Sequence, residues 1–273
     1  FKQKTAYEIS TRDWSSDVCS SDLWSDLKAA LQGELGSITS GPTSGIFIAF
    51  EGGEGTGKST QAKLLAQWLE QEGETVLLTR EPGGTDLGKD LRKILLGHET
   101  GVISPRAEAL LYAADRAHHV YSVIRPALER GGVVITDRYF DSSAAYQGAG
   151  RILNPGEVAR ISRWATESLY PTLTILIDLP AEIGLSRLQS RDRLESESND
   201  FHERIRQEYL QMAMLDPERY FVVDGTQPVE ELHDQIINRV ADITTLKRNA
   251  QGPQQNESLK PIPIATQIGR AHV

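Results

Sequence analysis

The chain has 273 residues and a mass of 30.2 kDa, and 39% of its residues are hydrophobic. This is enough to bury the core of one domain of about 200 residues. A formal net charge of −9 disfavours a surface that binds a nucleic-acid backbone. The longest apolar runs are far shorter than the ~20 residues of a membrane-spanning helix, and no basic-then-apolar leader precedes the first motif. We therefore expect a soluble cytoplasmic protein with no membrane or nucleic-acid partner.

Both ends of the chain look foreign to a natural protein. One back-translation of the last six residues, "IGRAHV", reads on the complementary strand as "DVCSSD", which stands near the start. Such an inverted match is typical of a sequencing adapter translated at both ends of an assembled read. The single cysteine, Cys19, lies in this stretch, and the only methionines, Met212 and Met214, lie far downstream. Without Cys19 the chain has no thiol, which excludes disulfides and thiolate chemistry and fits a reducing compartment.

The expected organisation has one domain between two segments without a fold of their own. The segment before the domain ends in Ser, Thr, Gly and Pro and is typical of a linker or upstream read-through. The C-terminal segment is polar, contains several prolines and lacks apolar periodicity, which predicts disorder. The expected parts are residues 1–45 outside the domain (1–23 adapter-derived, 24–45 linker), the domain at 46–245, and a disordered tail at 246–273 (268–273 adapter-derived).

Short apolar runs alternate with helical patterns along the expected domain. The runs are "GIFIAF", "TVLLT", "GVVITD", "TLTILIDL" and "RYFVVDG". Strands that are apolar on both faces and joined by helices predict a parallel sheet covered on each side. Proline at the first helical turn marks helix starts at Ser104-Pro105, Asn154-Pro155 and Gln227-Pro228. Pro126 is expected to kink or break the long helical segment that precedes Gly131.

The segment "GGEGTGKS", residues 52–59, has the phosphate-loop pattern G-x-x-x-x-G-K-[ST] between an apolar strand and an amphipathic helix. Its glycines let backbone N–H groups surround phosphate oxygens, and the helix adds its positive N-terminal end. Lys58 is expected to reach the terminal phosphates, and Ser59 to ligate Mg²⁺. A glycine-rich turn without a ligand is the alternative, which this context opposes. The expected triphosphate-binding residues are Gly52, Gly53, Glu54, Gly55, Thr56, Gly57, Lys58, Ser59 and Thr60.

Two further segments follow strands and should lie at the same sheet edge as the phosphate loop. They are "TREPGGT", residues 79–85, and "DRYFDSSAAYQG", residues 137–148. Arg80 and Arg138 could hold a second anion there, and Asp137 could order Mg²⁺ or its waters. The alternatives are a plain turn for the first segment and a surface ion pair for Asp137 and Arg138.

The helical segment "LLYAADRAHH", residues 110–119, places Tyr112 and Arg116 one turn apart on one face. An aromatic ring beside a guanidinium could stack on a base and hydrogen-bond it. Alternatively, Tyr112 fills the core and Arg116 forms an outward salt bridge. His118 and His119 lack an i,i+4 partner and are expected on the helix surface.

These segments, followed by "LIDLPAEIGLSR" and "DFHERIRQEYL", resemble the bacterial type of thymidylate kinase over residues 46–245. The resemblance implies a three-layer α/β/α P-loop nucleoside monophosphate kinase fold with a five-stranded parallel sheet. It implies transfer of the γ-phosphoryl group of ATP to dTMP, giving dTDP and ADP for dTTP synthesis, with Mg²⁺ as the metal. It also implies a homodimer.

The resemblance assigns roles to single residues. It places Arg138 on the acceptor phosphate with Arg80 and Pro82 beside it, Tyr112 on the thymine ring, and Arg116 at a thymine carbonyl. It places Ser143 near the N3 edge of the base and Tyr146 against the sugar 2′ position, with Gln147 continuing the wall that Tyr146 forms. It also implies that Glu54 orients the acceptor sugar or metal waters. The expected substrate-binding residues are Arg80, Pro82, Tyr112, Arg116, Arg138, Ser142, Ser143, Tyr146 and Gln147.

Some family members carry an arginine inside the phosphate loop, where this chain has Gly55. The segment "SRLQSRDRLESESND", residues 186–200, is instead similar to members whose arginines come from a mobile lid, although by itself it could be a solvated mixed-charge loop. We expect Arg191 and Arg193, rather than Arg187, to be the lid arginines. The expected catalytic residues are Glu54, Lys58, Asp137, Arg138, Arg191 and Arg193.

Two other functions compete with this prediction. One is a kinase for another nucleoside monophosphate, such as dUMP. The other is a nucleotide-binding switch or ATPase that is not a kinase. The chain lacks the N-K-x-D guanine-binding motif of GTPases, and its third strand ends in Asp137-Arg138 rather than in the Asp-Glu of motor ATPases.

Overall fold

The computed structural model describes residues 44–151 and 153–251. The ends that we expect to be adapter-derived, the expected linker and most of the C-terminal tail lie outside the described residues. The last helix, α10 (Val229–Gln251), extends past the domain boundary expected at residue 245. In the described part of the chain, no helix is long and apolar enough to cross a membrane.

The sheet has five parallel strands in the order β2-β3-β1-β4-β5. All five apolar runs form strands, as predicted. The central strand is buried along its whole length, because both of its faces are covered by helices. The strands are β1 (Ile46–Glu51), β2 (Val76–Arg80), β3 (Val133–Asp137), β4 (Leu173–Asp178) and β5 (Tyr220–Asp224).

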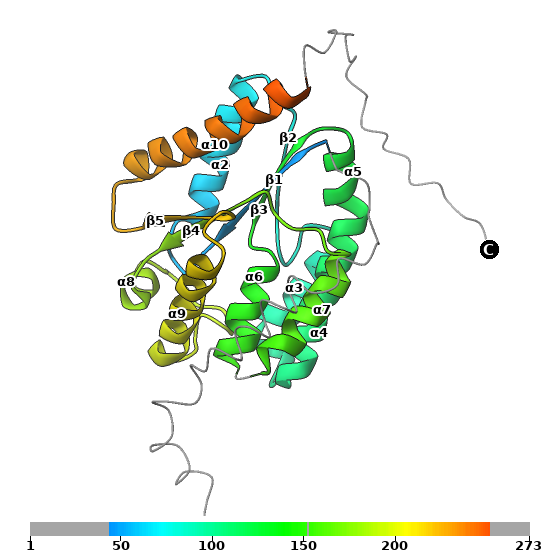
Figure 1. Cartoon of the computed structure of the whole chain (residues 1–273). Coiled ribbons are helices and arrows are strands. Elements are labelled where there is room, and N and C mark those ends of the chain that lie inside the picture. The colour runs from blue at the N-terminus through cyan, green and yellow to red at the C-terminus, as the bar shows by residue number, and fades with distance from the viewer. Residues whose placement is uncertain (1–43, 152, 252–273) are drawn as a thin grey trace, which may run out of the picture.

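Helices cover both faces of the sheet and confirm the three-layer α/β/α arrangement (Figure 1). Helices α2 and α10 pack on one face, and the remaining long helices lie on the other. Besides α10, the helical elements are α2 (Lys58–Gln71), α3 (Asp86–Leu96), η1 (His98–Thr100), α4 (Pro105–His119), η2 (Val120–Ile124), α5 (Arg125–Glu129), α6 (Phe140–Ser143), η3 (Ala144–Gly150), α7 (Pro155–Thr166), α8 (Ala181–Ser186) and α9 (Asn199–Leu215).

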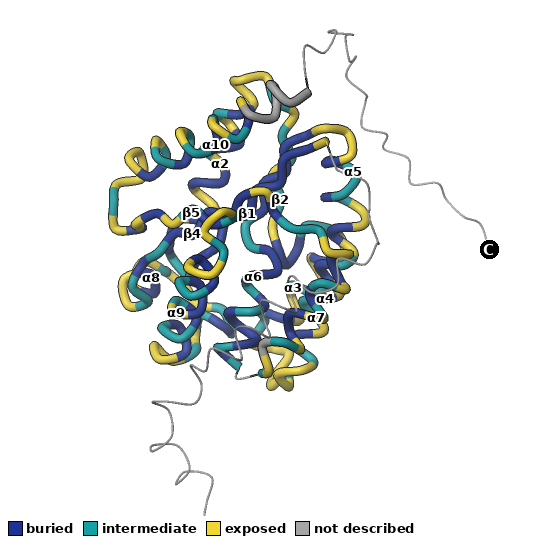
Figure 2. Tube along the Cα trace, in the orientation of Figure 1, coloured by how far each residue is buried: buried dark blue, intermediate teal, exposed yellow. Residues whose placement is uncertain are grey.

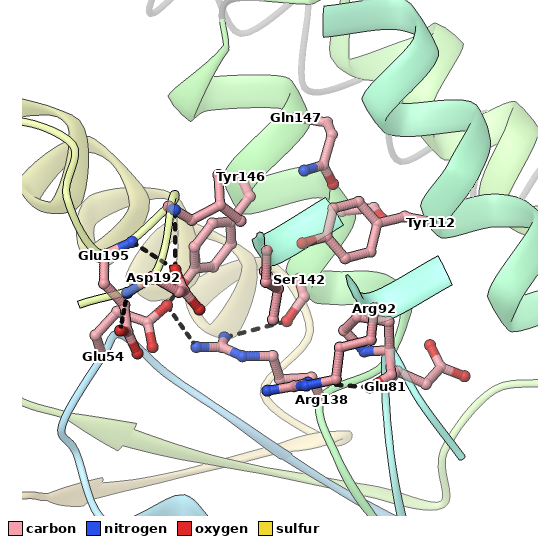
Figure 3. A pocket seen from close by; sticks show the side chains of 14 residues that line it. Glu54, Glu81, Arg92, Tyr112, Arg138, Ser142, Tyr146, Gln147, Asp192 and Glu195 are labelled. Carbon is pink, nitrogen blue, oxygen red and sulfur yellow. Dashed lines mark hydrogen bonds and ion pairs between the residues drawn. The ribbon is translucent and has the colours of Figure 1, made fainter. Parts of the chain in front are cut away.

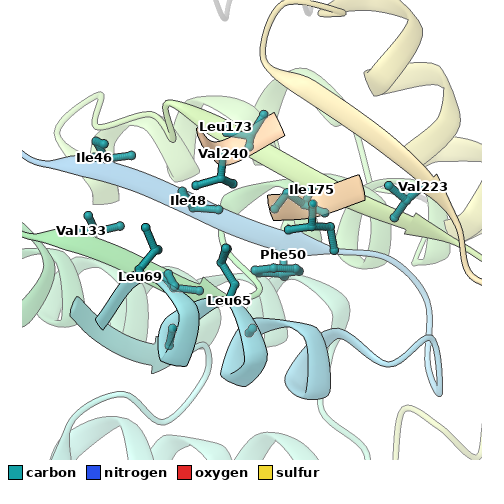
Figure 4. Packing of buried hydrophobic residues seen from close by; sticks show 14 of the residues in the cluster. Ile46, Ile48, Phe50, Leu65, Leu69, Val133, Leu173, Ile175, Val223 and Val240 are labelled. Atoms are coloured by element: carbon teal, nitrogen blue, oxygen red, sulfur yellow. The ribbon is translucent and has the colours of Figure 1, made fainter. Parts of the chain in front are cut away.

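Apolar side chains between the sheet and the helix pair α2 and α10 form one core (Figure 4). Phe50 of β1, Leu65 and Leu69 of α2, and Val240 of α10 are fully buried there. Each such side chain stabilises the fold by about 1.5–3 kcal/mol relative to an exposed one. Along the tube of Figure 2, buried segments follow the strands and the inner sides of the helices. This packing fixes the loops that leave the carboxyl ends of the strands.

The predicted helix starts are confirmed. The side chain of Ser104 caps α4 by accepting from Ala107 N at 3.4 Å, and Asn154 caps α7 by accepting from Glu157 N at 3.1 Å. Pro126 does not end its helical segment. Instead α4 widens into η2, and α5 continues from there, so that the chain remains helical from α4 to Glu129.

Candidate functional site

The phosphate-binding loop connects β1 to α2, which begins at Lys58 as the motif predicted. The unpaired N–H groups of the first turn of α2 therefore lie at the loop. Gly55 has a φ of 65°, and a Cβ there would lie only 2.0 Å from the carbonyl oxygen of Gly184 in α8. No larger residue fits while α8 packs on the loop. An arginine inside the phosphate loop at this position would therefore collide with α8 as it packs here.

The charged side chains of the loop lie close to Arg138. Lys58 is 7% exposed, and its Nζ donates to Gly53 O and to Thr56 Oγ1. Burial, followed by the charge of Arg138, lowers the pKa of Lys58 to about 8. Burial acts to raise the pKa of Glu54, but Arg138 and Lys58 together outweigh it and lower that pKa to about 2. Glu54 is therefore ionised between two cations.

The two expected metal ligands lie together at the edge of the loop. The hydroxyl of Ser59 in α2 donates to Oδ2 of Asp137 at the end of β3. Oxygen donors at a phosphate loop have the chemistry that Mg²⁺ prefers. Among residues 44–151 and 153–251, no group of three or more His, Cys, Asp or Glu side chains could hold a metal by itself. Mg²⁺ commonly uses one or two carboxylates together with water and substrate oxygens.

Arg138 follows β3 in a left-handed conformation with a φ of 72°, which is strained for arginine. Its guanidinium donates to Gly52 O at 3.0 Å and to Glu54 Oε1 at 2.9 Å. The guanidinium also lies over the ring of Tyr146, 4.9 Å from its centroid (Figure 3). The strained backbone of Arg138 is therefore found together with a guanidinium that several contacts hold beside the phosphate loop.

The buried carboxylate of Glu51 holds the segment that carries Arg138. Its Oε1 accepts from the N–H groups of Tyr139 at 2.8 Å and Ser142 at 3.2 Å. Its Oε2 accepts from the hydroxyls of Ser142 and Tyr209, each at 2.7 Å. Burial raises the pKa of Glu51 to about 7. These contacts join the end of β1, the segment after β3 and helix α9 in one hydrogen-bonded network.

A cavity extends from Arg138 to helix α4. Tyr112 of α4 and Tyr146 of η3 stand on different sides of it (Figure 3). Seven of its lining residues belong to the expected substrate-binding set, namely Pro82, Tyr112, Arg138, Ser142, Ser143, Tyr146 and Gln147. The other lining residues are Glu54, Glu81, Arg92, Leu96, Asp192, Leu194 and Glu195. We call this the acceptor cavity.

A second cavity lies over the phosphate loop, and we call it the phosphate cavity. It is lined by residues 54–60 of the loop and helix start, together with Arg80, Glu81, Arg92, Asp137, Arg138, Leu188 and Glu195. Arg80 and Arg138 therefore line the same cavity as Lys58. The residues shared by the two cavities are Glu54, Glu81, Arg92, Arg138 and Glu195. The shared wall thus carries two arginines and three carboxylates, and an anionic group could reach the two arginines from either cavity.

Comparison with known proteins identifies the family. A family model described as thymidylate kinase matches residues 50–236. The chain is 58% identical to the thymidylate kinase of Clavibacter michiganensis subsp. michiganensis over 193 residues, which are 69% of this chain and 91% of that protein. It is 59% identical to the thymidylate kinase of Leifsonia xyli subsp. xyli over 196 residues, 70% of this chain and 92% of that protein. The chain belongs to the thymidylate kinase family.

A solved structure agrees with this assignment. The crystal structure of thymidylate kinase from Ehrlichia chaffeensis matches with a TM-score of 0.59 and 30% identity, covering 72% of this chain and 98% of that chain. The P-loop nucleoside monophosphate kinase fold that the sequence predicted is therefore confirmed. The chain is an enzyme of the nucleoside monophosphate kinase class, as its motifs indicated.

Tyr112 and Arg116, the two residues of the thymidylate kinase motif on α4, lie in different places relative to the acceptor cavity. Tyr112 lines the acceptor cavity. Arg116 lies behind the cavity wall, 1% exposed, and donates to Glu81 at 2.7 Å and to Ser143 Oγ at 3.1 Å, with its third nitrogen on Tyr139 O at 3.1 Å. The sequence left open whether these side chains contact a base or whether Tyr112 fills the core and Arg116 forms an outward salt bridge. Tyr112 faces the cavity, as a contact with a base requires, whereas Arg116 forms an ion pair that points inward. Contact of Arg116 with a base carbonyl stays a prediction.

The prediction that both histidines of α4 lie on the surface is wrong for His119. His118 is exposed, but His119 is fully buried. Its Nδ1 lies 3.0 Å from Glu81 Oε1, and its Nε2 lies 2.7 Å from Thr79 Oγ1. The reason is tertiary, because the "TREPGGT" turn of the thymidylate kinase motif packs against the end of α4. His119 therefore supports Glu81 from behind.

The expected lid arginines do not line the phosphate cavity. Arg193 forms a partly buried ion pair with Glu108, and Arg191 is exposed. Arg187, which the sequence analysis passed over, donates to the phosphate-loop carbonyl of Gly55 at 3.3 Å. The contact of Arg191 and Arg193 with the transferred group stays a prediction.

Sequence analysis missed three charged residues of the shared wall, namely Glu81, Arg92 and Glu195. Arg92 donates to Pro82 O at 3.0 Å, and burial, followed by the charge of Arg80, lowers its pKa. A signal for Arg92 was present. In a helix that begins at Asp86, Arg92 shares the face of the buried residue Gly88, one turn earlier. Arginine is rarely buried without a partner, so its place on the inward face of this helix indicates a polar partner there.

Proposed function

We propose that the phosphate cavity binds the phosphates of ATP and the acceptor cavity binds dTMP, so that the γ-phosphoryl group passes to the 5′-phosphate and gives dTDP and ADP. The observation that supports this most directly is the shared wall, where Arg92 and Arg138 face both cavities beside Lys58. Family membership supplies the identity of the two nucleotides. The other candidate, a non-kinase switch or ATPase, gives no reason for a second cavity that ends on two arginines.

The proposed catalysis is positioning combined with charge stabilisation. Both substrates are anions, and their phosphates repel one another unless cations lie between them. Arg80 was expected beside the acceptor phosphate, but it lines the phosphate cavity and not the acceptor cavity, so with Lys58 it would act on the donor side. Arg92 and Arg138 would act where the two phosphates meet. No protein nucleophile is needed, because the acceptor phosphate oxygen attacks the γ-phosphorus directly.

The far end of the acceptor cavity is proposed to hold the base and sugar. Tyr112 offers an aromatic surface for the pyrimidine ring, and Ser143 and Gln147 offer polar groups at the base edge. Tyr146 lies between the base end and Glu54, to which its hydroxyl donates. This position supports the proposal that Tyr146 crowds the sugar 2′ position and favours deoxyribose.

The residues present also fit Mg²⁺, although no metal contact is shown. Ser59 and Asp137 would hold the ion, directly or through waters, next to the donor phosphates. When bound, Mg²⁺ would neutralise part of the charge on the phosphates. The chain's own residues orient this site, since the contact between Ser59 and Asp137 joins α2 to the end of β3.

Three further expectations remain proposals. The lid arginines Arg191 and Arg193 are proposed to approach the transferred group in another arrangement of their segment. Arg193 then leaves Oε2 of Glu108, and Oε1 keeps its contacts with Arg151 and Gln147. A homodimer is proposed because large apolar side chains such as Leu110 of α4 and Trp164 of α7 are exposed, and a second copy could cover them. A cytoplasmic location is proposed from the chemistry of the substrates.

A nucleotide panel on the full chain tests the proposed function. With ATP and Mg²⁺, ADP release should be stimulated most strongly by dTMP, compared with dUMP, UMP and dGMP. Arg138→Ala should abolish most of this turnover, whereas Arg130→Ala, at an exposed residue after α5, should not change it. If another monophosphate is preferred, the base assignment is wrong and the kinase assignment stands. If no monophosphate stimulates ADP release, the enzyme is an ATPase or switch.

A further inference from the structure

Gln147 lies at the base end of the acceptor cavity and is held by a residue outside it. The side chain is 1% exposed and lines the cavity. Its Nε2 donates to Oε1 of Glu108 at 3.2 Å. Glu108 is on α4 and does not line the cavity, so it can affect a ligand only through the residues that it contacts.

Glu108 is a fully buried carboxylate surrounded by donors from three segments. Arg151, which follows η3, donates to Oε1 at 3.2 Å and to Oε2 at 3.4 Å. Arg193, between α8 and α9, donates to Oε2. Glu108 forms ion pairs with both arginines, and in such a pair the carboxylate oxygens accept hydrogen bonds. Only the NH₂ side of the Gln147 carboxamide can therefore face it.

The opposite side of the carboxamide is turned into the cavity. In Figure 3 the oxygen of Gln147 points toward Tyr112, which also lines the cavity. Within residues 44–151 and 153–251, no donor forms a hydrogen bond to this oxygen. The cavity thus presents a fixed acceptor, whereas a freely rotating glutamine would present either a donor or an acceptor.

We propose that Glu108 is a positioning residue that sets base specificity by locking Gln147 with its carbonyl oxygen inward. This rests on the proposed binding of dTMP in the acceptor cavity. A pyrimidine with an N3–H group, such as thymine or uracil, donates to that oxygen. Cytosine has a lone pair at N3 and would face the oxygen with no hydrogen between them. The lock therefore admits thymine and uracil and rejects cytosine.

The size of the effect follows from the cost of unpaired polar groups. A site built to hydrogen-bond a substrate N–H can reject an analogue that lacks it by ~10⁴-fold. Without Glu108 the carboxamide can turn its NH₂ group inward and donate to cytosine N3, so part of this discrimination disappears. We expect the ratio of kcat/KM for dTMP to that for dCMP to fall by about tenfold or more in Glu108→Gln.

The experiment measures kcat/KM for dTMP, dUMP and dCMP on the full chain and on Glu108→Gln. These ratios do not depend on how much of a variant is folded. The dTMP to dCMP ratio should fall through KM, while the dTMP to dUMP ratio should stay constant, because uracil also has an N3–H group. Glu157→Gln, which removes a carboxylate from the exposed pair with Arg106, is the matched control and should leave both ratios unchanged.

Glu108→Asp covers the case in which Glu108→Gln fails to fold. Asp keeps the charge for Arg151 and Arg193 but withdraws the acceptor from Gln147, so the dTMP to dCMP ratio should again fall. An unchanged ratio in either folded variant, or an equal fall of both ratios, overturns the proposal and leaves Glu108 a structural residue. If the unsubstituted enzyme does not use dTMP, it is the proposed function that fails.

Discussion

Arg138 Nη2 donates to Glu54 Oε1 at 2.9 Å, and both residues line the acceptor cavity and the phosphate cavity. The pair therefore stands where the two proposed nucleotides meet. The hydroxyl of Tyr146 donates to the same Oε1. The guanidinium of Arg138, at the end of β3, is thus positioned by Glu54 of the phosphate loop and by Tyr146 of η3, although these segments lie far apart in the sequence.

Arg138→Lys should reduce kcat/KM for dTMP by ~10²-fold or more, although the positive charge is kept. The planar guanidinium contacts Gly52 O and Glu54 Oε1 together, and a single ammonium group cannot span both. The loss is measured in a coupled ADP-release assay, with Arg130→Lys as the control. A variant with near-normal turnover would show that charge alone suffices.

The activity should depend on the protonation of Lys58. Its pKa is lowered to about 8, so the side chain is charged below this pH and loses its proton as the pH rises through it. Since kcat/KM reports the free enzyme, kcat/KM for ATP should fall above about pH 8. In Lys58→Arg the cation persists at high pH, so this fall should vanish even if overall activity is lower. A fall at the same pH in the variant would assign it to another group.

Arg92→Ala should raise KM for dTMP by about tenfold to a hundredfold, because it removes a cation from the wall shared by both cavities. Arg80 lines only the phosphate cavity of the two, so Arg80→Ala should affect dTMP less than Arg92→Ala does. Titration of each variant with dTMP at saturating ATP separates the two effects. Equal increases in KM would contradict the distinct positions of these arginines.

His119→Leu should destabilise the fold by about 2–4 kcal/mol, because it removes a partner from the buried carboxylate of Glu81 and from the partly buried hydroxyl of Thr79. His118→Leu, at the exposed neighbour, should change the free energy of unfolding by less than about 0.5 kcal/mol. Urea unfolding of both variants gives the comparison. Similar values for the two would mean that the contacts of His119 contribute little.

The sequence determined the elements and the parts of the site that are local. Five apolar runs indicated the buried parallel strands, and the phosphate loop was recognisable because its spacing, its strand and its helix are contiguous. The same applies to the helix starts at Ser104 and Asn154, where the capping side chain is three residues from its donor. Arg80 and Arg138 were placed at the correct edge because parallel strands end together.

Only the tertiary structure decided which side chains share a wall. Arg92, His119 and Glu108 have ordinary helical surroundings in the sequence, and their roles come from segments that pack against them. Arg193 is the clearest case. Its segment predicted a lid arginine, yet the structure pairs it with Glu108, 85 residues earlier. Local periodicity sets which face of a helix is buried, but charge partners are set by the packing of distant elements.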